Sequence, residues 1–204
     1  MAHGIKAHTL NLPLESIEVP NGCIRIDANR DARPIHGKPY AFISEMVEVA
    51  RANDWPCLMI INSDIALHDP NKVLPGYIEQ AERGLVVPQR WDHNGDLQNL
   101  TQFTSGWDVF IIHRKFYGIV GESLFVMGQT WWDYWLPYRF IQSKVPLLSV
   151  KEPIFTHQRH PIQYSNASWE RMTRLFQWHE QYMERNNSRM VSNSVHQLIL
   201  RHAR

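Results

Sequence analysis

A polar triplet directly follows the most apolar segment of the chain. Residues 57–61 read Cys-Leu-Met-Ile-Ile, and Asn62, Ser63 and Asp64 come next. This pattern is typical of a buried strand that delivers polar groups at its C-terminal edge, where open α/β sheets bind ligands. A carboxylate beside a hydroxyl and an amide suits a divalent cation that holds a phosphate-bearing substrate. Because all three residue types also favour turns, a purely conformational role stays open.

A second carboxylate, Asp133, lies in the aromatic stretch 128–136, Gly-Gln-Thr-Trp-Trp-Asp-Tyr-Trp-Leu. Thr130 and Asp133 have the spacing of a capping box, which predicts that Asp133 caps a helix. Surrounding indole rings would disfavour its charged form and raise its pKa toward that of a useful general base. The two roles are compatible, and we keep both.

Two further groups of residues carry chemistry. His157 and His160, three residues apart, can bind a metal through neutral imidazole, although eleven histidines make a chance pair unsurprising. The irregular loop 28–39 contains Arg30, Arg33 and Lys38 beside a predicted strand end. These cations can hold a diphosphate, or they can belong to a solvated loop.

The secondary-structure elements expected to position these residues are strands and helices that alternate along the chain. Residues 1–22 predict an irregular lead-in, 23–27 a strand, 40–53 an amphipathic helix, and 57–62 the central strand. We therefore expect a strand–helix–strand crossover between parallel neighbours over 24–67. A short helix with Pro75 in its first turn follows within 68–84, then strands at 85–88, 107–113 and 145–150 around a long polar loop at 89–105. An amphipathic helix begins near residue 169, and residues 185–204 predict a peripheral basic helix or tail.

Length and composition indicate one globular domain spanning residues 1–204. The chain is 44% hydrophobic and 20% charged, with a formal net charge of +1, so its overall charge gives no reason to expect a polyanionic partner. Since no apolar run approaches the length of a membrane span and the N-terminal residues form no signal core, we predict a cytoplasmic protein. Cys23 and Cys57 are expected to be reduced core thiols. Eight tryptophans exceed the need of a plain core, and spare ones would suit ligand stacking or a homodimer face.

The order of these parts resembles the GT-A type of glycosyltransferase, specifically small bacterial and phage members with an Asn-Ser-Asp-Ile motif. Four pieces carry the resemblance, over about two thirds of the chain: IRID (24–27), MIINSDIAL (59–67), GWDVFIIHR (106–114), and GQTWWDYWL (128–136) followed by THQRH (156–160). The resemblance implies a single-domain α/β fold, GT-A-like or abbreviated Rossmann-like, with a mixed, mostly parallel sheet flanked by helices. The sequence departs from the family pattern at its start, where the usual first strand and its nucleotide-binding turn are short or missing in residues 1–22.

The resemblance further implies a role for each matching residue. Asp64, with His157 or His160, would coordinate Mn²⁺ or Mg²⁺, and Asp133 would be the general base of an inverting transfer. The remaining assignments are donor contacts from Asp27, Asn62 and Ser63, joined by Arg33 and Lys38 of the cationic loop, and an acceptor side formed by Gly128, Trp131 and Trp132. Asn62 stands where many members have an aspartate.

The resulting hypothesis is a metal-dependent glycosyltransferase with a nucleotide-sugar donor, a UDP-sugar being favoured. Its acceptor would be a glycan, a protein, a metabolite or a modified nucleic acid. The runner-up is a non-catalytic nucleotide-sugar or carbohydrate-binding domain with a degenerate GT-A fold. A metal-dependent phosphoryl hydrolase ranks lower, because the sequence lacks the dense ligand cluster of a two-metal site.

Overall fold

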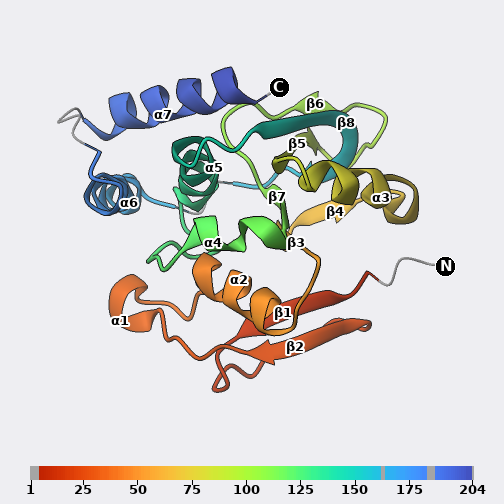
Figure 1. Cartoon of the computed structure of the whole chain (residues 1–204), viewed down its shortest axis with the longest axis horizontal. Coiled ribbons are helices and arrows are strands. Elements are labelled where there is room, and N and C mark those ends of the chain that lie inside the picture. Colours follow the sequence, from red (N-terminus) through yellow and green to blue (C-terminus); the bar gives the residue numbers. More distant parts are fainter. Residues whose placement is uncertain (1–4, 162–163, 183–186, 204) are drawn as a thin grey trace.

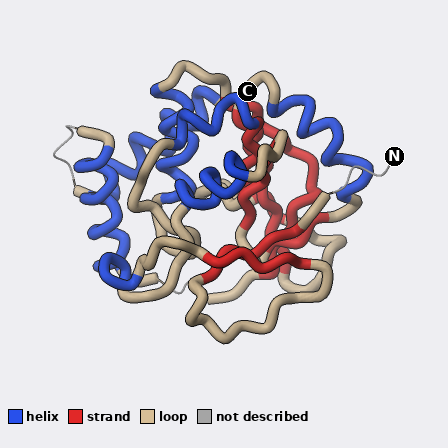
Figure 2. Tube along the Cα trace, turned by 60° about the horizontal axis from the view of Figure 1, so that its bottom comes forward, coloured by secondary structure: helices blue, strands red, loops and turns tan. Residues whose placement is uncertain are grey.

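A computed structural model describes residues 5–161, 164–182 and 187–203 of the 204-residue chain. It confirms an α/β architecture, with a main sheet, a small two-stranded sheet and helices packed around them (Figures 1 and 2). The helices are α1 (Arg33–His36), α2 (Ile43–Ala52), α3 (Pro70–Ala81), α4 (Tyr117–Val120), α5 (Trp132–Gln142), α6 (Asn166–His179) and α7 (Ser188–His202), with the 3₁₀ turn η1 (Arg114–Phe116).

The main sheet is mixed. Its strands follow the spatial order β3 (Cys57–Ile61), β7 (Val109–His113), β5 (Leu85–His93), β8 (Leu147–Gln158) and β4 (Ile65–Leu67), and the short β6 (Thr101–Gln102) pairs with β5. Only β5 and β8 pair in parallel, whereas β3–β7, β5–β7, β4–β8 and β5–β6 are antiparallel. The expectation of a mostly parallel sheet was therefore wrong. Apolar runs mark buried strands but do not encode the direction of a neighbour.

The N-terminal region also differs from expectation. β1 (Ala7–Asn11) and β2 (Cys23–Asp27) form a parallel two-stranded sheet, so the segment predicted as an irregular lead-in contains a strand. β2 and β3 lie in different sheets, and the predicted crossover between parallel neighbours was wrong. β1 escaped prediction because its sequence, Ala-His-Thr-Leu-Asn, has no apolar alternation.

The two faces of the main sheet have separate cores. Phe110 and Ile112 of β7 face a large cluster with α2, α4, α5, α6 and α7, whereas Val109 and Ile111 face a smaller cluster with α3. This alternation is the period of two expected for a strand that is buried on both sides. Figure 1 shows α3 on the opposite side of the strands from α6 and α7.

Local predictions had mixed outcomes for the helices. The helix expected at 40–53 is α2, and the basic C-terminal segment contains α7, which buries Val191, Val195 and Ile199. α3 begins earlier than expected, at Pro70, so Pro75 lies inside the helix and not in its first turn. The predicted Thr130 capping box is absent: the N-cap of α5 is Trp131 in the left-handed region (φ 77°), with no side-chain cap hydrogen bond.

The clustered tryptophans are mainly structural. Trp131 and Trp135 of the α5 region are fully buried. Trp135 stacks on Phe125 with ring centroids 4.9 Å apart, and Trp131 packs on Phe176 at 4.8 Å. Such aromatic pairs add roughly 0.5–1.5 kcal/mol beyond the area they bury. The aromatic stretch 128–136 thus anchors α5 in the core and fixes where its first turn presents Asp133.

Candidate active site

The central strand ends in a turn that is fastened to the neighbouring strand. Because β3 and β7 pair Ile61 with Val109, the next positions outward, Asn62 and Asp108, face each other. The Asn62 amide N–H donates to the Asp108 carbonyl (3.2 Å), and its side-chain amide donates to Asp108 Oδ1 (2.5 Å). The Asn62 side chain is therefore committed to a carboxylate, and Ser63 and Asp64 are left exposed at the strand end.

Asp64, His157 and His160 come together as predicted. Asp64 Oδ2 lies 3.4 Å from His157 Nε2 and 3.2 Å from His160 Nε2. One ligand atom from each residue falls within 4.8 Å of the others. β4 and β8 bring these segments together, since Ile65 is paired with His157. The arrangement is a candidate metal centre of two imidazoles and one carboxylate.

An irregularity in β8 sets the position of His157. Between the pairs Pro88–Val150 and Arg90–Phe155, two steps along β5 are matched by five along β8, so β8 carries three extra residues. Beyond this irregularity the register pairs Asp92 with His157. A bulge of this kind bends the strand and re-aims the side chains that follow it.

A buried polar network stands behind the three candidate ligands. His157 Nδ1 lies 3.3 Å from Asp92 Oδ1, so its Nε2 is the nitrogen turned to Asp64. The Arg90 guanidinium pairs with Asp92 Oδ1 (2.9 Å) and with Asp108 Oδ2 (2.6 Å), and it stacks over the Phe103 ring. A carboxylate on the second nitrogen of a histidine is the usual support of a metal ligand.

Asp92, Arg90 and Asp108 were not identified from the sequence as residues of the site. Arg90 and Asp92 were assigned to a polar loop, whereas they lie on the extension of β5. Their alternate spacing, Arg-Trp-Asp, was the available signal, because it places both side chains on one face of a strand. Asp108 precedes an apolar strand and has no signal of its own, since its importance comes from the register with Asn62.

Asp133 lies in the first turn of α5 and is partly buried. Burial and then the charge of Asp108 raise its pKa from 3.8 to about 8, although hydrogen bonds with the backbone of Trp107, Asp133 and Tyr134 act in the opposite direction. A Cβ at Gly106 would lie only 2.7 Å from Asp133 Oδ2, so any larger residue at this position would force the Asp133 carboxyl group to move. The sequence-based expectation of a raised pKa is consistent with this environment.

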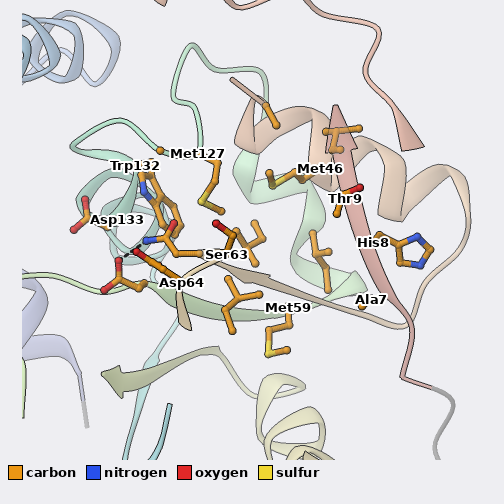
Figure 3. A pocket seen from close by; sticks show the side chains of 18 of the residues that line it. Ala7, His8, Thr9, Met46, Met59, Ser63, Asp64, Met127, Trp132 and Asp133 are labelled. Carbon is orange, nitrogen blue, oxygen red and sulfur yellow. Dashed lines mark hydrogen bonds between the residues drawn. The ribbon is translucent and has the colours of Figure 1, made fainter. Parts of the chain in front are cut away.

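Asp64 and Asp133 line the same cavity. It has a volume of about 1720 Å³ and is lined by the strand-end turn, the candidate metal ligands His157 and His160, the start of α5 and, on the other side, by β1 and α2. In Figure 3, Asp64, Asp133 and Trp132 lie together, and His8 and Thr9 of β1 lie across the cavity from them. Two carboxylates that are 69 positions apart in the sequence numbering thus share one space.

The wall formed by β1 was not foreseen from the sequence. His8 Nδ1, Thr9 Oγ1 and Asn11 Oδ1 are buried side-chain atoms with no hydrogen-bond partner, and all three residues line the cavity. Unpaired buried polar atoms are costly, so these groups are suited to a polar ligand. His8 also stacks on Trp55, with ring centroids 4.4 Å apart.

The predicted donor residues divide into two groups. Asn62, Ser63 and Lys38 line the cavity. Asp27 does not, because it is exposed and pairs with Arg25 Nε at 3.0 Å. Arg33 lies on α1 and pairs with Asp31 at 2.7 Å, and this hydrogen-bonded pair lowers the pKa of Asp31. The structure does not bring Asp27 or Arg33 to the cavity that Asp64 and Asp133 line.

The third cation of that loop, Arg30, is also structural: it donates to Ser44 Oγ and to the Ser123 carbonyl, and it stacks on Phe42.

Only some of the residues predicted for the acceptor side lie at the cavity. Gly128 and Trp132 line the cavity, and Gly128 has a positive φ of 83°. Trp131 is fully buried in the core and is not a lining residue, so its assignment was wrong. The one-residue step along the start of α5 turns neighbouring indoles in different directions, and spacing alone did not reveal which one faces the cavity.

Both cysteines are free and partly buried. Cys57 packs against the smaller core cluster, as expected, and burial raises the pKa of its thiol to about 12, whereas Cys23 lies on β2, outside the core clusters.

None of the helices in the described part of the chain is long and apolar enough to cross a membrane.

No protein-family model matches the chain, and comparisons with curated proteins and with solved structures gave no match.

Proposed function

We propose that the protein is a metal-dependent glycosyltransferase that moves a sugar from a nucleoside-diphosphate sugar to an acceptor hydroxyl. One observation carries this proposal: the candidate metal ligands Asp64, His157 and His160 line the same cavity as Asp133, a carboxyl group with a raised pKa. Glycosyl transfer needs a positive charge beside the leaving diphosphate and a base beside the acceptor.

The chemistry of the donor set fits a divalent ion. Two imidazole nitrogens and one carboxylate oxygen suit Mn²⁺ better than Mg²⁺, because Mg²⁺ prefers oxygen ligands. The Asp92 carboxylate behind His157 would hold that imidazole in the orientation a ligand needs. When bound, the ion would neutralise the charge that builds on the departing diphosphate.

Asp133 would act as the general base. Its carboxylate would accept the proton of the acceptor hydroxyl while that oxygen forms a bond to the anomeric carbon. The bond from this carbon to the diphosphate oxygen then breaks, and its electron pair stays on the diphosphate. With a pKa of about 8, the ionised fraction of Asp133 rises with pH and reaches one half near pH 8, so the rate of transfer should rise through this range as well.

The donor would extend from the candidate metal ligands toward β1. Asn62 and Ser63 stand at the strand end beside Asp64, and Lys38 is a cation on the cavity wall. Thr9 and Asn11 offer buried polar atoms that no protein group satisfies, which suits the hydroxyls or carbonyls of a nucleoside. The cavity volume of about 1720 Å³ is ample for a nucleotide sugar together with part of an acceptor.

The test is release of nucleoside diphosphate from a panel of nucleotide sugars with Mn²⁺. We expect release by the wild-type protein and its loss in Asp64→Ala and in Asp133→Asn. Asp96→Asn is the matched control, because Asp96 is exposed, bonds only to its own loop neighbours Gln98 and Asn99, and is not a lining residue. Binding of nucleotide sugars without release would refute the transferase and support a carbohydrate- or nucleotide-binding domain.

A further inference from the structure

A layered group of aromatic rings runs from the core to the mouth of the cavity. Tyr164 is 50% exposed and stacks on Trp169, with centroids 5.8 Å apart and planes 28° from parallel. Trp169 in turn packs on the buried rings of Trp131 (5.8 Å) and Tyr134 (6.2 Å). The outermost ring is thus supported from behind by core residues, so little freedom would be lost if a ligand covered its exposed surface.

Neighbouring hydrogen bonds fix this group in place. Ser165 caps α6 by accepting from the Ser168 amide, and Ser168 Oγ donates to the side-chain carbonyl of Gln129. Gln129 belongs to the loop that precedes α5 and also lines the cavity. The start of α6, which carries Trp169, is therefore tied to the segment that leads to Asp133.

The position of Tyr164 connects it with the proposed base. Tyr164, Trp169 and Asp133 all line the cavity. Burial and then the negative charge of Asp133 raise the pKa of Tyr164, so the phenol and the carboxyl group are close enough to interact. A ligand that covers the Tyr164 ring would accordingly lie in the cavity that Asp133 also lines.

Exposure alone does not single out this residue. Two large aromatic side chains are exposed in the described part of the chain, Tyr164 and Trp178. Trp178 is 71% exposed, but it does not line the cavity. Single exposed aromatic residues are common and need no explanation, whereas an exposed ring that is stacked, anchored and beside a candidate base does.

We propose that Tyr164, supported by Trp169, forms the acceptor subsite and stacks on a sugar ring, so that the acceptor is a glycan. A pyranose has an apolar C–H face that covers an aromatic ring and a rim of hydroxyls that donate hydrogen bonds. With one face of the ring on Tyr164, a rim hydroxyl would reach Asp133. This inference rests on the proposed function, and it narrows the acceptor from any hydroxyl compound to a carbohydrate.

In the test, the whole protein is titrated with methyl glycosides of glucose, galactose, mannose and N-acetylglucosamine. Saturation-transfer NMR measures binding of each glycoside and shows which of its protons contact the protein. We expect at least one glycoside to bind, with the strongest transfer to C–H protons on one face of its ring. Tyr164→Phe keeps the aromatic ring and should retain the Kd within about threefold. Tyr164→Ala should weaken binding at least tenfold, and Trp178→Ala, which removes an exposed ring elsewhere, should leave it unchanged.

Three outcomes would overturn the subsite: no glycoside binds, Tyr164→Ala binds as well as the wild type, or Tyr164→Ala weakens uridine monophosphate and leaves glycosides unaffected. The last outcome would make Tyr164 a nucleobase contact. Thermal melting checks that each variant is folded. Because Tyr164 is half-exposed, we expect its replacement to leave the fold intact. Nucleotide release without glycoside binding rejects the subsite alone, whereas Tyr164-dependent glycoside binding without release rejects the transferase alone.

Discussion

The substitution Asp133→Asn should stabilise the protein, relative to the wild type, by an amount that grows as pH rises from 5 to 8. Burial of the Asp133 carboxyl group, and then the charge of Asp108, raise its pKa from 3.8 to about 8. Between these two values the unfolded chain has lost the proton and the folded chain keeps it. Because the unfolded state binds fewer protons, the free energy of unfolding falls as pH rises through this window. Asparagine has nearly the same shape and does not titrate.

The size of the effect follows from the pKa difference. Each pH unit inside the window costs about 1.4 kcal/mol. Between pH 5 and pH 8, Asp133 should therefore remove on the order of 3–4 kcal/mol from the free energy of unfolding, allowing for its partial ionisation near pH 8. The Asp133 carboxyl group accepts hydrogen bonds from the backbone of Trp107 and Tyr134, and the asparagine variant keeps only some of them. At pH 5 each lost hydrogen bond should cost the variant about 1 kcal/mol.

The assay is urea unfolding at pH 5, 6, 7 and 8, followed by tryptophan fluorescence in the presence of a chelator. The measured quantity is the difference in free energy of unfolding between Asp133→Asn and the wild type. Every other titrating group is shared, so the change of this difference with pH reports on Asp133. Parallel pH curves for the two proteins would refute the argument, because they would mean that Asp133 is ionised in the folded state as it is in the unfolded state.

Asp96→Asn supplies the matched control. Hydrogen bonds from Gln98 and Asn99 lower the pKa of Asp96, which is the opposite direction. Its contribution to stability is present above the unfolded pKa and is lost as pH falls through the folded value, so Asp96→Asn should not gain stability between pH 5 and pH 8.

Three further predictions concern the supports of the site. Asp92→Asn should weaken Mn²⁺ binding about 10–100-fold in calorimetry without unfolding the protein, and unchanged affinity would show that the carboxylate behind the imidazole has no supporting role. Gly106→Ala should displace Asp133, because the added Cβ would lie 2.7 Å from Asp133 Oδ2. The variant should lose about 1–3 kcal/mol in its free energy of unfolding and should also release less nucleoside diphosphate. Wild-type behaviour in both assays would contradict the close approach of Asp133 to Gly106. Asn62→Asp should cost about 1–3 kcal/mol in urea unfolding at pH 8, because it replaces the amide that donates to Asp108 with a second carboxylate, and a stabilised variant would be the contrary result.

Sequence patterns revealed those parts of the site that lie where a strand ends or within a single element. The apolar run of β3 followed by a polar turn located Asp64, and the helical spacing after Tyr40 located α2. These signals are local, because burial of a strand or of one helix face imposes a period on neighbouring residues.

The remaining parts depend on contacts between distant segments. Asp108 matters because antiparallel pairing places it opposite Asn62, and Asp92 matters because β8 runs beside β5. Neither the direction of a neighbouring strand nor its register is encoded in a local period. For the same reason the sequence identified the aromatic stretch but did not separate Trp132, at the cavity, from Trp131, in the core.

The three additional residues of β8 make the spacing along this strand a condition for assembling the candidate metal centre. Successive strand residues point to opposite faces, so deleting one residue between Val150 and Phe155 would turn the His157 imidazole away from Asp64 while leaving the apolar half of β8 in the core. Length variation in homologous chains should accordingly be tolerated in the exposed hairpin around Gly95 and selected against in this part of β8. A descendant that lost a residue there could keep its fold and lose its chemistry in a single step.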